Sequence, residues 1–245
     1  MQKHTNERRQ EMKTAKDIIL RALSYDGLGE DSKGNVIFNT DYYGGKVNRH
    51  IPWCCAFVWD IFRMEGASKL FFNGKKTAYV PAVETYARKM KKTVAKDKGK
   101  LGDIVLFNFS GSGGAEHIGF IVGQRKNGSY ITVEGNTSAG TNGSQSDGMC
   151  VAVKNRTQSQ IRCIYRPKYD ETKDTEIEYK KKKTYHLLKA RSIRTQASTS
   201  ATKLGTLGMG KKVTCLAVKK VGKNTWIKTE KGWIAAYFNG NTYVG

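Results

Sequence analysis

The chain has 245 residues, which is enough for one large domain or two smaller ones, and its 12 Tyr, 9 Phe and 4 Trp can fill real cores. No apolar run approaches the ~20 residues of a membrane-spanning helix, so we expect no insertion into a membrane. The net charge of +22 attracts polyanions, but the lysines of the C-terminal part stand among strand-like residues and not on one basic helix. We therefore expect no nucleic-acid partner.

Cysteine usage and the N-terminus both indicate synthesis in a reducing cytosol. The five cysteines are an odd number and show neither the paired spacing of a metal site nor a dense disulfide pattern. The first residues are charged and lack the apolar stretch of a signal peptide. Three cysteines fall in predicted strands, where we expect small buried side chains: Cys150, Cys163 and Cys215.

Three helices are predicted in the N-terminal third of the chain. Thr14 can cap the first helix, and residues 26–50, rich in Gly, Asn and Asp, are typical of a long loop. A second helix begins near Cys54, carries apolar residues at spacings of three and four, and stops at Gly66. Pro81 favours the first turn of a third helix.

After the third helix the hydrophobic pattern changes to that of strands. Five strands are expected, with a turn through residues 126–129 between the second and the third: residues 101–107, 117–123, 130–134, 150–154 and 161–165. Helices followed by an antiparallel sheet make an α+β layout, which we assign to residues 1–167.

A second domain is predicted beyond a charged linker. Residues 168–183 are charged and poor in aliphatic side chains, which is typical of a linker. After them, short strand-like runs alternate with turn residues at 185–188, 211–218, 225–229 and 232–235. This pattern indicates a small all-β barrel over residues 184–245. The C-terminal part is also the denser in positive charge, because residues 1–170 and 171–245 each carry a net +11.

A thiol at a helix start indicates the chemistry of the chain. Cys54 and Cys55 open the apolar run of the second helix, where the helix dipole and the free amides favour a thiolate. Only one of two adjacent helical residues can face the sheet. Position along the apolar face does not decide whether Cys54 or Cys55 is the nucleophile, although Cys54 is nearer the helix start. His117 opens a strand after the Gly-rich loop 110–114, and its imidazole can take the thiol proton.

Glu134 and Asn136 can orient that imidazole. If the second and third strands form a hairpin with a loop centred near Lys126-Asn127, Glu134 lies opposite Gly119 and Asn136 opposite His117. A tight turn at Asn127-Gly128 would move the pairing by two residues, and in either register Glu134 and Asn136 share a face with His117. A third polar group of this kind fixes the tautomer and the orientation of a catalytic imidazole. The sequence therefore predicts a papain-like constellation, with a rate that falls with a pKa near neutrality.

These segments resemble the CHAP family of peptidoglycan amidases and endopeptidases over roughly residues 14–167. In that family the nucleophile follows the Trp and precedes the Phe by three residues. The resemblance thus implies Cys54 as nucleophile, His117 as base, Glu134 and Asn136 as orienting residues, and a papain-like fold of helices packed on an antiparallel sheet. The matching runs are Pro52-Trp53-Cys54-Cys55-Ala56-Phe57-Val58, Gly102-Asp103-Ile104-Val105-Leu106-Phe107, His117-Ile118-Gly119-Phe120-Ile121-Val122 and Val133-Glu134-Gly135-Asn136-Thr137.

Residues 184–240 are similar to bacterial SH3-type wall-binding domains. The similarity rests on three short runs: Lys189 to Arg194, Leu204 to Leu207 and Lys231 to Tyr237. Aromatic side chains there can contact the wall, and the candidates are Trp226, Trp233 and Tyr237. A CHAP domain followed by such a barrel is the architecture of a phage endolysin.

The resemblance implies thiol-dependent hydrolysis of an amide bond in Gram-positive peptidoglycan, either the N-acetylmuramoyl-L-alanine amide or a peptide bond. The oxyanion would lie at the helix start near the amides of Cys54 or Cys55, with Tyr43 as a side-chain candidate. The expected partners are peptidoglycan and anionic wall polymers, and the chain is expected to be a monomer. The resemblance also implies residence in the host cytoplasm, holin-dependent release and action at the cell wall.

We expect neither a cofactor nor a metal. Some CHAP endolysins carry a calcium loop with alternating acids shortly before the nucleophile. Here residues 39–43 offer one carboxylate, Asp41, and the two other nearby acids are Glu30 and Asp31.

Two other functions fit the same residues. A cysteine peptidase acting on proteins would use the same constellation. A basic wall- or polyanion-binding module without catalysis would leave the Cys and the His as structural residues. Thiol alkylation separates these alternatives, since a binding module survives it and an enzyme does not.

Overall fold

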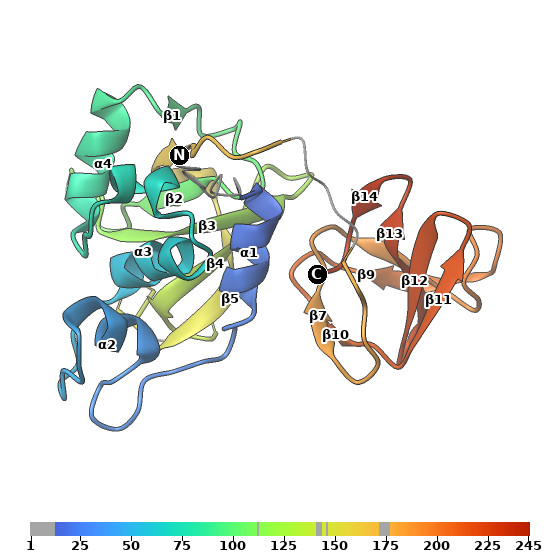
Figure 1. Cartoon of the computed structure of the whole chain (residues 1–245). Helices are drawn as coiled ribbons and strands as arrows, with labels where there is room; N and C mark the ends of the chain where they lie inside the picture. Colours follow the sequence, from blue (N-terminus) through green and yellow to red (C-terminus); the bar gives the residue numbers. More distant parts are fainter. Residues whose placement is uncertain (1–12, 112, 141–143, 146, 172–176) are drawn as a thin grey trace, which may run out of the picture.

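The computed structural model describes residues 13–111, 113–140, 144–145, 147–171 and 177–245. It has an α+β part followed by an all-β part, as predicted (Figure 1). Each part has a hydrophobic core of its own. Residues 1–12 of the first predicted domain and 172–176 of the predicted linker lie outside the described residues.

Three helices begin where the sequence predicts. Helix α1 (Ala15–Leu23) is capped by Thr14, whose hydroxyl accepts from the amide of Asp17 while the Asp17 carboxylate accepts from the Thr14 amide. Helix α3 is Cys54–Met64, and α4 (Val80–Lys89) has Pro81 in its first turn. Two short 3-10 segments lie between them: η1 (Ser68–Leu70) and η2 (Phe72–Gly74). None of the described helices is long and apolar enough to cross a membrane.

The prediction of a continuous loop over residues 26–50 is wrong, because the structure has helix α2 (Ile37–Tyr43) there. The helix has only seven residues, too few to show an apolar periodicity. Its start is set by Asn39, whose side chain accepts from the Val36 amide and donates to the Gly34 carbonyl. The buried side chain of Asn39 thus takes the place of a Ser, Thr, Asp or Asn at the N-cap position, where this helix has Val36. The sequence therefore lacks the usual signal for a helix start.

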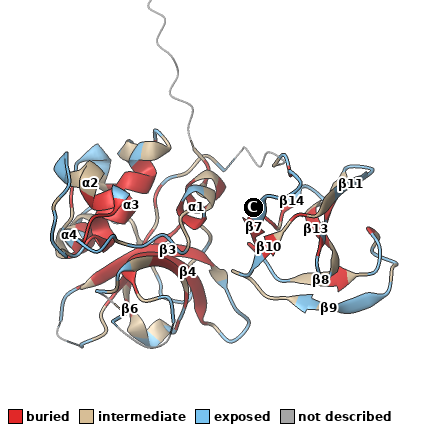
Figure 2. Cartoon of the chain, turned by 90° about the horizontal axis from the view of Figure 1, so that it is seen from below, coloured by how far each residue is buried: buried red, intermediate tan, exposed pale blue. Residues whose placement is uncertain are grey.

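The six strands of the first part form one antiparallel sheet in the order β1-β6-β2-β3-β4-β5. Helices α1, α3 and α4 cover one face of it (Figure 2). On that face Phe57 and Phe62 of α3 contact Phe120 of β3. The strands are β1 (Thr93–Val94), β2 (Ile104–Phe107), β3 (His117–Gln124), β4 (Tyr130–Thr137), β5 (Cys150–Arg156) and β6 (Ile161–Tyr165), with the 3-10 segment η3 (Gln158–Gln160) before β6. The predicted five strands are present, and β1 is an addition.

The C-terminal part is all β. One sheet has the order β11-β12-β13-β8-β9, with β14 beside β13, and β7 pairs with β10. The predicted single strand 211–218 is in fact two strands, because the chain turns at Cys215-Leu216 and continues into the other sheet. The strands are β7 (Thr184–His186), β8 (Arg191–Arg194), β9 (Lys203–Leu207), β10 (Lys212–Thr214), β11 (Ala217–Val221), β12 (Asn224–Thr229), β13 (Gly232–Phe238) and β14 (Asn241–Thr242).

The two parts contact each other through polar and apolar side chains. Asp26, after α1, accepts from Nε2 of His186 at 3.2 Å and from Nζ of Lys212 at 3.0 Å. Lys16 of α1 donates to the hydroxyl of Thr242 at 3.3 Å. Leu188 of the C-terminal part packs in the core of the first part. The catalytic candidates lie entirely in the first part.

Candidate active site

The first residue of α3 is Cys54, and local contacts fix where the helix starts. The N-cap residue Trp53 supplies no side-chain cap, so the first amides of α3 have no side-chain acceptor from that residue. Instead, Nε1 of Trp53 donates to Glu30 at 2.5 Å, and the same carboxylate lies 2.5 Å from Nδ1 of His50. Gly135 of β4 lets the helix start approach closely, because a Cβ there would lie 2.6 Å from Phe57.

His117 and Glu134 lie together on neighbouring strands. Nε2 of His117 donates to Oε2 of Glu134 at 3.0 Å, and neither side chain is exposed. The predicted register is confirmed for Glu134, which pairs with Gly119. A Cβ on Gly119 would lie 2.5 Å from Cγ of Glu134, so the glycine is what lets the carboxylate pass over β3.

Cys54 also interacts with His117, since it is one of the groups that raise the pKa of the imidazole. Nδ1 of His117 is buried, and no described group meets it with hydrogen-bond geometry. Burial lowers the pKa of His117, but Cys54 and Glu134 outweigh it and raise that pKa to about 9. Burial raises the pKa of Glu134, but Arg156 and then His117 outweigh it and lower that pKa to about 2. The arrangement favours an imidazolium beside an ionised carboxylate.

Cys55 has the opposite environment. Its Sγ donates to the carbonyl of Thr77 at 3.5 Å, and the side chain is 1% exposed. Burial, and then the neighbouring Cys54, raise the pKa of Cys55 well above its usual value. A thiol held protonated in this way is a poor nucleophile. The environments of the two cysteines therefore differ, whereas their positions in the helix did not show which of them is the nucleophile.

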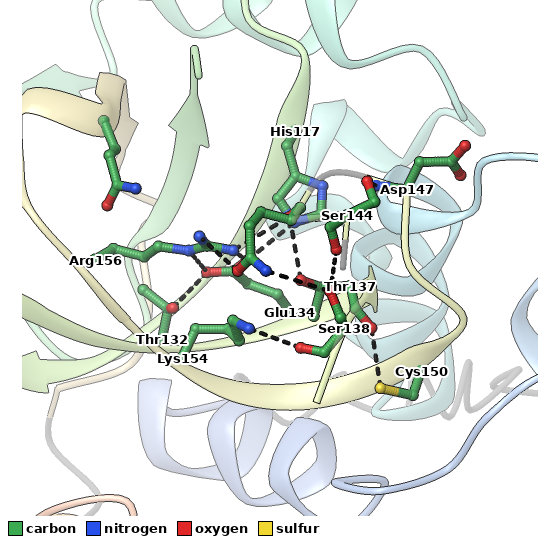
Figure 3. Close-up of polar contacts among 12 residues, drawn as sticks. His117, Thr132, Glu134, Thr137, Ser138, Ser144, Asp147, Cys150, Lys154 and Arg156 are labelled. Carbon is green, nitrogen blue, oxygen red and sulfur yellow. Dashed lines mark hydrogen bonds and ion pairs between the residues drawn. The ribbon is translucent and has the colours of Figure 1, made fainter. Parts of the chain in front are cut away.

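Two groups that the sequence reasoning missed complete the site, Arg156 and Thr132 (Figure 3). Arg156 of β5 donates to both oxygens of Glu134, from Nε at 2.8 Å and from Nη2 at 2.5 Å. The hydroxyl of Thr132 donates to Oε1 of Glu134 at 2.5 Å. Thr132 lies two residues before Glu134 on the same strand, so strand alternation could have indicated it. No comparable local signal exists for Arg156.

Asn136 and Tyr43 are not brought to the imidazole by any contact among the described residues. The side chain of Asn136 is buried and donates to Asp147 at 3.0 Å. Its φ of 55° belongs to a bulge in the pairing of β4 with β5. The pairing of β3 with β4 ends at Gly119 and Glu134, so the predicted pair of Asn136 with His117 is not formed. Tyr43 ends α2, is 53% exposed and packs edge-on against Tyr42.

The acids considered for calcium are bound to protein groups. Asp41 pairs with Arg63, and Asp31 accepts from the amides of Lys33 and Asn35. Within the described ranges no three His, Cys, Asp or Glu side chains gather as metal ligands.

The three wall-binding candidates differ in exposure. Trp226 is 3% exposed and packs against Phe238, so it is a core residue and offers no free ring surface. Trp233 and Tyr237 are half-buried and remain the candidates for contact with a ligand. Nearby, a cavity of about 420 Å³ is lined by lysines, threonines and one acid: Lys211, Lys212, Lys231, Thr206, Thr214, Thr229 and Glu230.

Residues 45–136 match the family model of the CHAP domain, and this range contains Cys54, His117, Glu134 and Asn136. The match places the CHAP similarity in the α+β part of the chain, around the candidate site.

Three solved structures share weak similarity with the whole chain. The crystal structure of Ly7917 is 13% identical, covers 95% of this chain and 97% of that one, and has a TM-score of 0.38. Ly7917 with the hydrolysing product of MDP gives 14% identity, the same coverage and a TM-score of 0.37. The wild-type endolysin LysIME-EF1 is 15% identical over 93% of this chain and 80% of that one, with a TM-score of 0.40. TM-scores this low establish no common arrangement of the whole chains. No curated protein matches this chain in sequence.

Proposed function

We propose that this protein is an endolysin-type cysteine hydrolase that cleaves an amide bond in Gram-positive peptidoglycan. The proposal rests mainly on the buried group formed by Cys54, His117 and Glu134. In this group the imidazole is hydrogen-bonded to the carboxylate at 3.0 Å. The CHAP match over residues 45–136 supports the choice of substrate. In this proposal residues 1–167 are the catalytic domain, 168–183 the linker and 184–245 an SH3-type wall-binding domain.

The proposed reaction proceeds through a thioester. The thiolate of Cys54 attacks the amide carbonyl, and the oxyanion forms at the start of α3, near the backbone amides of Cys54 or Cys55. His117, as imidazolium, protonates the leaving amine as the C–N bond breaks. The neutral imidazole then takes a proton from water, and the resulting hydroxide attacks the thioester and releases the acid and the thiolate. Glu134 holds the imidazole in place throughout.

The C-terminal domain would hold the enzyme on an insoluble substrate. A second contact raises the effective concentration of the catalytic domain at the wall. The net +11 of residues 171–245 supports attraction to anionic wall polymers. In the proposed life cycle the protein accumulates in the host cytoplasm and reaches the wall through a holin.

The test compares two neighbouring thiols on purified Gram-positive walls. Cys54→Ser should abolish the release of soluble fragments, while Cys55→Ser keeps most of it, because only Cys54 interacts with His117. Mass spectrometry of the fragments identifies the bond that is cut. Activity retained in Cys54→Ser and lost in Cys55→Ser would overturn the assignment. Cleavage of proteins but not of walls would favour the peptidase alternative.

A further inference from the structure

Arg156 is more tightly bound to the proposed catalytic carboxylate than His117 is. Its Nε and Nη2 atoms donate to the two oxygens of Glu134 at 2.8 Å and 2.5 Å, whereas the imidazole donates at 3.0 Å. Arg156 is 2% exposed and Glu134 is fully buried. A bidentate pair of this kind fixes the orientation of a carboxylate as well as its charge.

The guanidinium is itself held from several sides. It lies 4.7 Å from the ring centre of Phe109 and 5.3 Å from that of Phe107. Its Nη2 also donates to the backbone carbonyl of Gln145 at 3.2 Å. The rings of Phe107 and Phe109 also lie within 6 Å of His117, so one pair of aromatic side chains holds both cations.

We propose that Arg156 is a positioning residue that keeps the Cys54–His117 pair charged by balancing the buried carboxylate of Glu134. The proposal rests on the proposed function only in taking Cys54 as the reacting thiol. Thiolate, imidazolium, carboxylate and guanidinium together carry no net charge. Without the guanidinium the same buried group carries one negative charge, and burial of an unbalanced charge is costly. The least costly response is for the thiolate or the carboxylate to take up a proton.

The neighbouring charges do not contact Glu134, although Lys154 also interacts with it electrostatically. Lys154, on the same strand as Arg156, donates to the carbonyls of Ser138 and Gly140 at 2.7 Å and 2.5 Å. Glu116, which precedes His117, accepts from the amide of Ser110 at 2.7 Å and adds a further negative charge near the imidazole. Among the described residues, Arg156 is the one permanent cation that contacts Glu134.

The test uses the full chain with Arg156→Gln, Arg156→Lys and the control Arg162→Gln. Arg162 is a matched control because it also pairs with a glutamate, Glu84 at 2.9 Å, but on the partly exposed face of β6. Two quantities are measured from acid to alkaline pH: alkylation of Cys54 by iodoacetamide, mapped by mass spectrometry, and fragment release from walls. Circular dichroism gives the folded fraction.

Arg156→Gln should alkylate at Cys54 about tenfold more slowly at neutral pH, and both limbs of its pH–rate profile should move to higher pH. Removal of a positive charge makes every neighbouring group hold its proton more strongly, so a merely structural loss would lower the rate without moving the limbs. Arg156→Lys should keep the limbs in place and lose turnover, because one ammonium cannot bridge both oxygens. If Arg156→Gln does not fold, the Arg156→Lys variant still tests the proposal.

The proposal would be overturned if folded Arg156→Gln kept the wild-type pH–rate profile and the wild-type alkylation rate of Cys54. Full turnover in Arg156→Lys would also overturn it. Failure of the proposed function has a different signature. In that case the wild-type chain releases no wall fragments, while alkylation of Cys54 still depends on Arg156.

Discussion

At the scale of single residues, His117 differs from an ordinary imidazole because it interacts with both Cys54 and Glu134. Cys54 and Glu134 raise its pKa to about 9, against the expectation of a value near neutrality from the sequence. The reason is that both partners belong to distant segments of the chain. The hydrogen bond to Glu134 and the thiol therefore decide the protonation state at neutral pH.

The first prediction concerns pH. Because the imidazolium protonates the leaving amine, wall hydrolysis should stay high across neutral pH and fall as pH rises through about 9, where His117 loses its proton. The raised pKa of His117 also stabilises the folded state; this stabilisation is complete below the ordinary imidazole pKa and is lost as the pH rises to about 9. Initial rates of fragment release, measured over a range of pH, locate the alkaline fall of the pH–rate profile. A fall centred near pH ~6.5 would show that the imidazole has an ordinary pKa.

The second prediction separates Glu134 from Asn136. Glu134→Gln removes the charge that stabilises the imidazolium, and we expect a loss of about 10²-fold to 10⁴-fold in turnover. Asn136→Ala should lose less than about tenfold, because its amide donates to Asp147 and not to His117. Both variants are compared at equal folded fraction, since Glu134→Gln leaves Arg156 without its carboxylate. A larger loss from the asparagine variant would exchange their roles.

At the scale of elements, the β3–β4 hairpin has to let one carboxylate cross the neighbouring strand. We expect Gly119→Ala to lower turnover strongly while the chain stays folded, because its Cβ would lie 2.5 Å from Glu134 and displace the carboxylate from His117. Gly114→Ala is the control, since no atom lies within 4 Å of a Cβ there. Kinetics on walls and thermal unfolding give the two readouts. Wild-type turnover in Gly119→Ala would show that the close approach does not matter.

The elements that the sequence predicted well are those with local signals. Thr14 and Asp17 cap α1, Pro81 lies in the first turn of α4, and the turn near Gly128 joins β3 to β4. The turn does not set the whole register, because a bulge between Ile121 and Gly123 is also needed to bring Glu134 opposite Gly119. Local signals of this kind depend on neighbouring residues and can be read without the fold.

The elements and contacts that escaped prediction depend on distant partners. Helix α2 has too few residues for a periodic pattern. Arg156 pairs with Tyr130 across the sheet, while the residue opposite Glu134 is Ala152. The arginine reaches the carboxylate past the Thr132–Lys154 pair because its side chain is long. The bulge between Glu134 and Thr137 also turns Asn136 to Asp147. None of these features follows from spacing along the chain.

At the scale of the whole molecule, the two parts share contacts that a truncated chain would lose. Burial raises the pKa of Asp26, but His186 and Lys212 of the C-terminal part outweigh it and lower that pKa. Leu188 completes the core of the first part. Residues 1–170 alone would therefore expose an apolar surface and leave Asp26 without these partners. Tests of wall binding are cleaner in the full chain for this reason.

The last prediction concerns the proposed binding of the C-terminal part to the cell wall. Lys211 and Lys231 line the 420 Å³ cavity and make no ion pair within the described residues, so their charges are available to an anionic polymer. The double variant Lys211→Gln/Lys231→Gln should bind whole cells several-fold more weakly at low salt, where the screening length is ~30 Å. The control Lys75→Gln/Lys89→Gln removes the same charge from the first domain, at exposed positions.

The salt dependence of cell binding distinguishes the attraction between charges from the contacts of aromatic rings. At 1 M salt the screening length falls to ~3 Å, so the lysine variant and the wild-type chain should bind alike. The remaining binding should weaken in Trp233→Ala and Tyr237→Ala, because half-buried aromatic rings give contacts that salt does not screen. Sedimentation of fluorescently labelled protein with cells measures each step. Complete loss of wild-type binding at high salt would reduce the domain to a charge anchor. Absence of binding at every salt concentration would remove the wall-binding assignment.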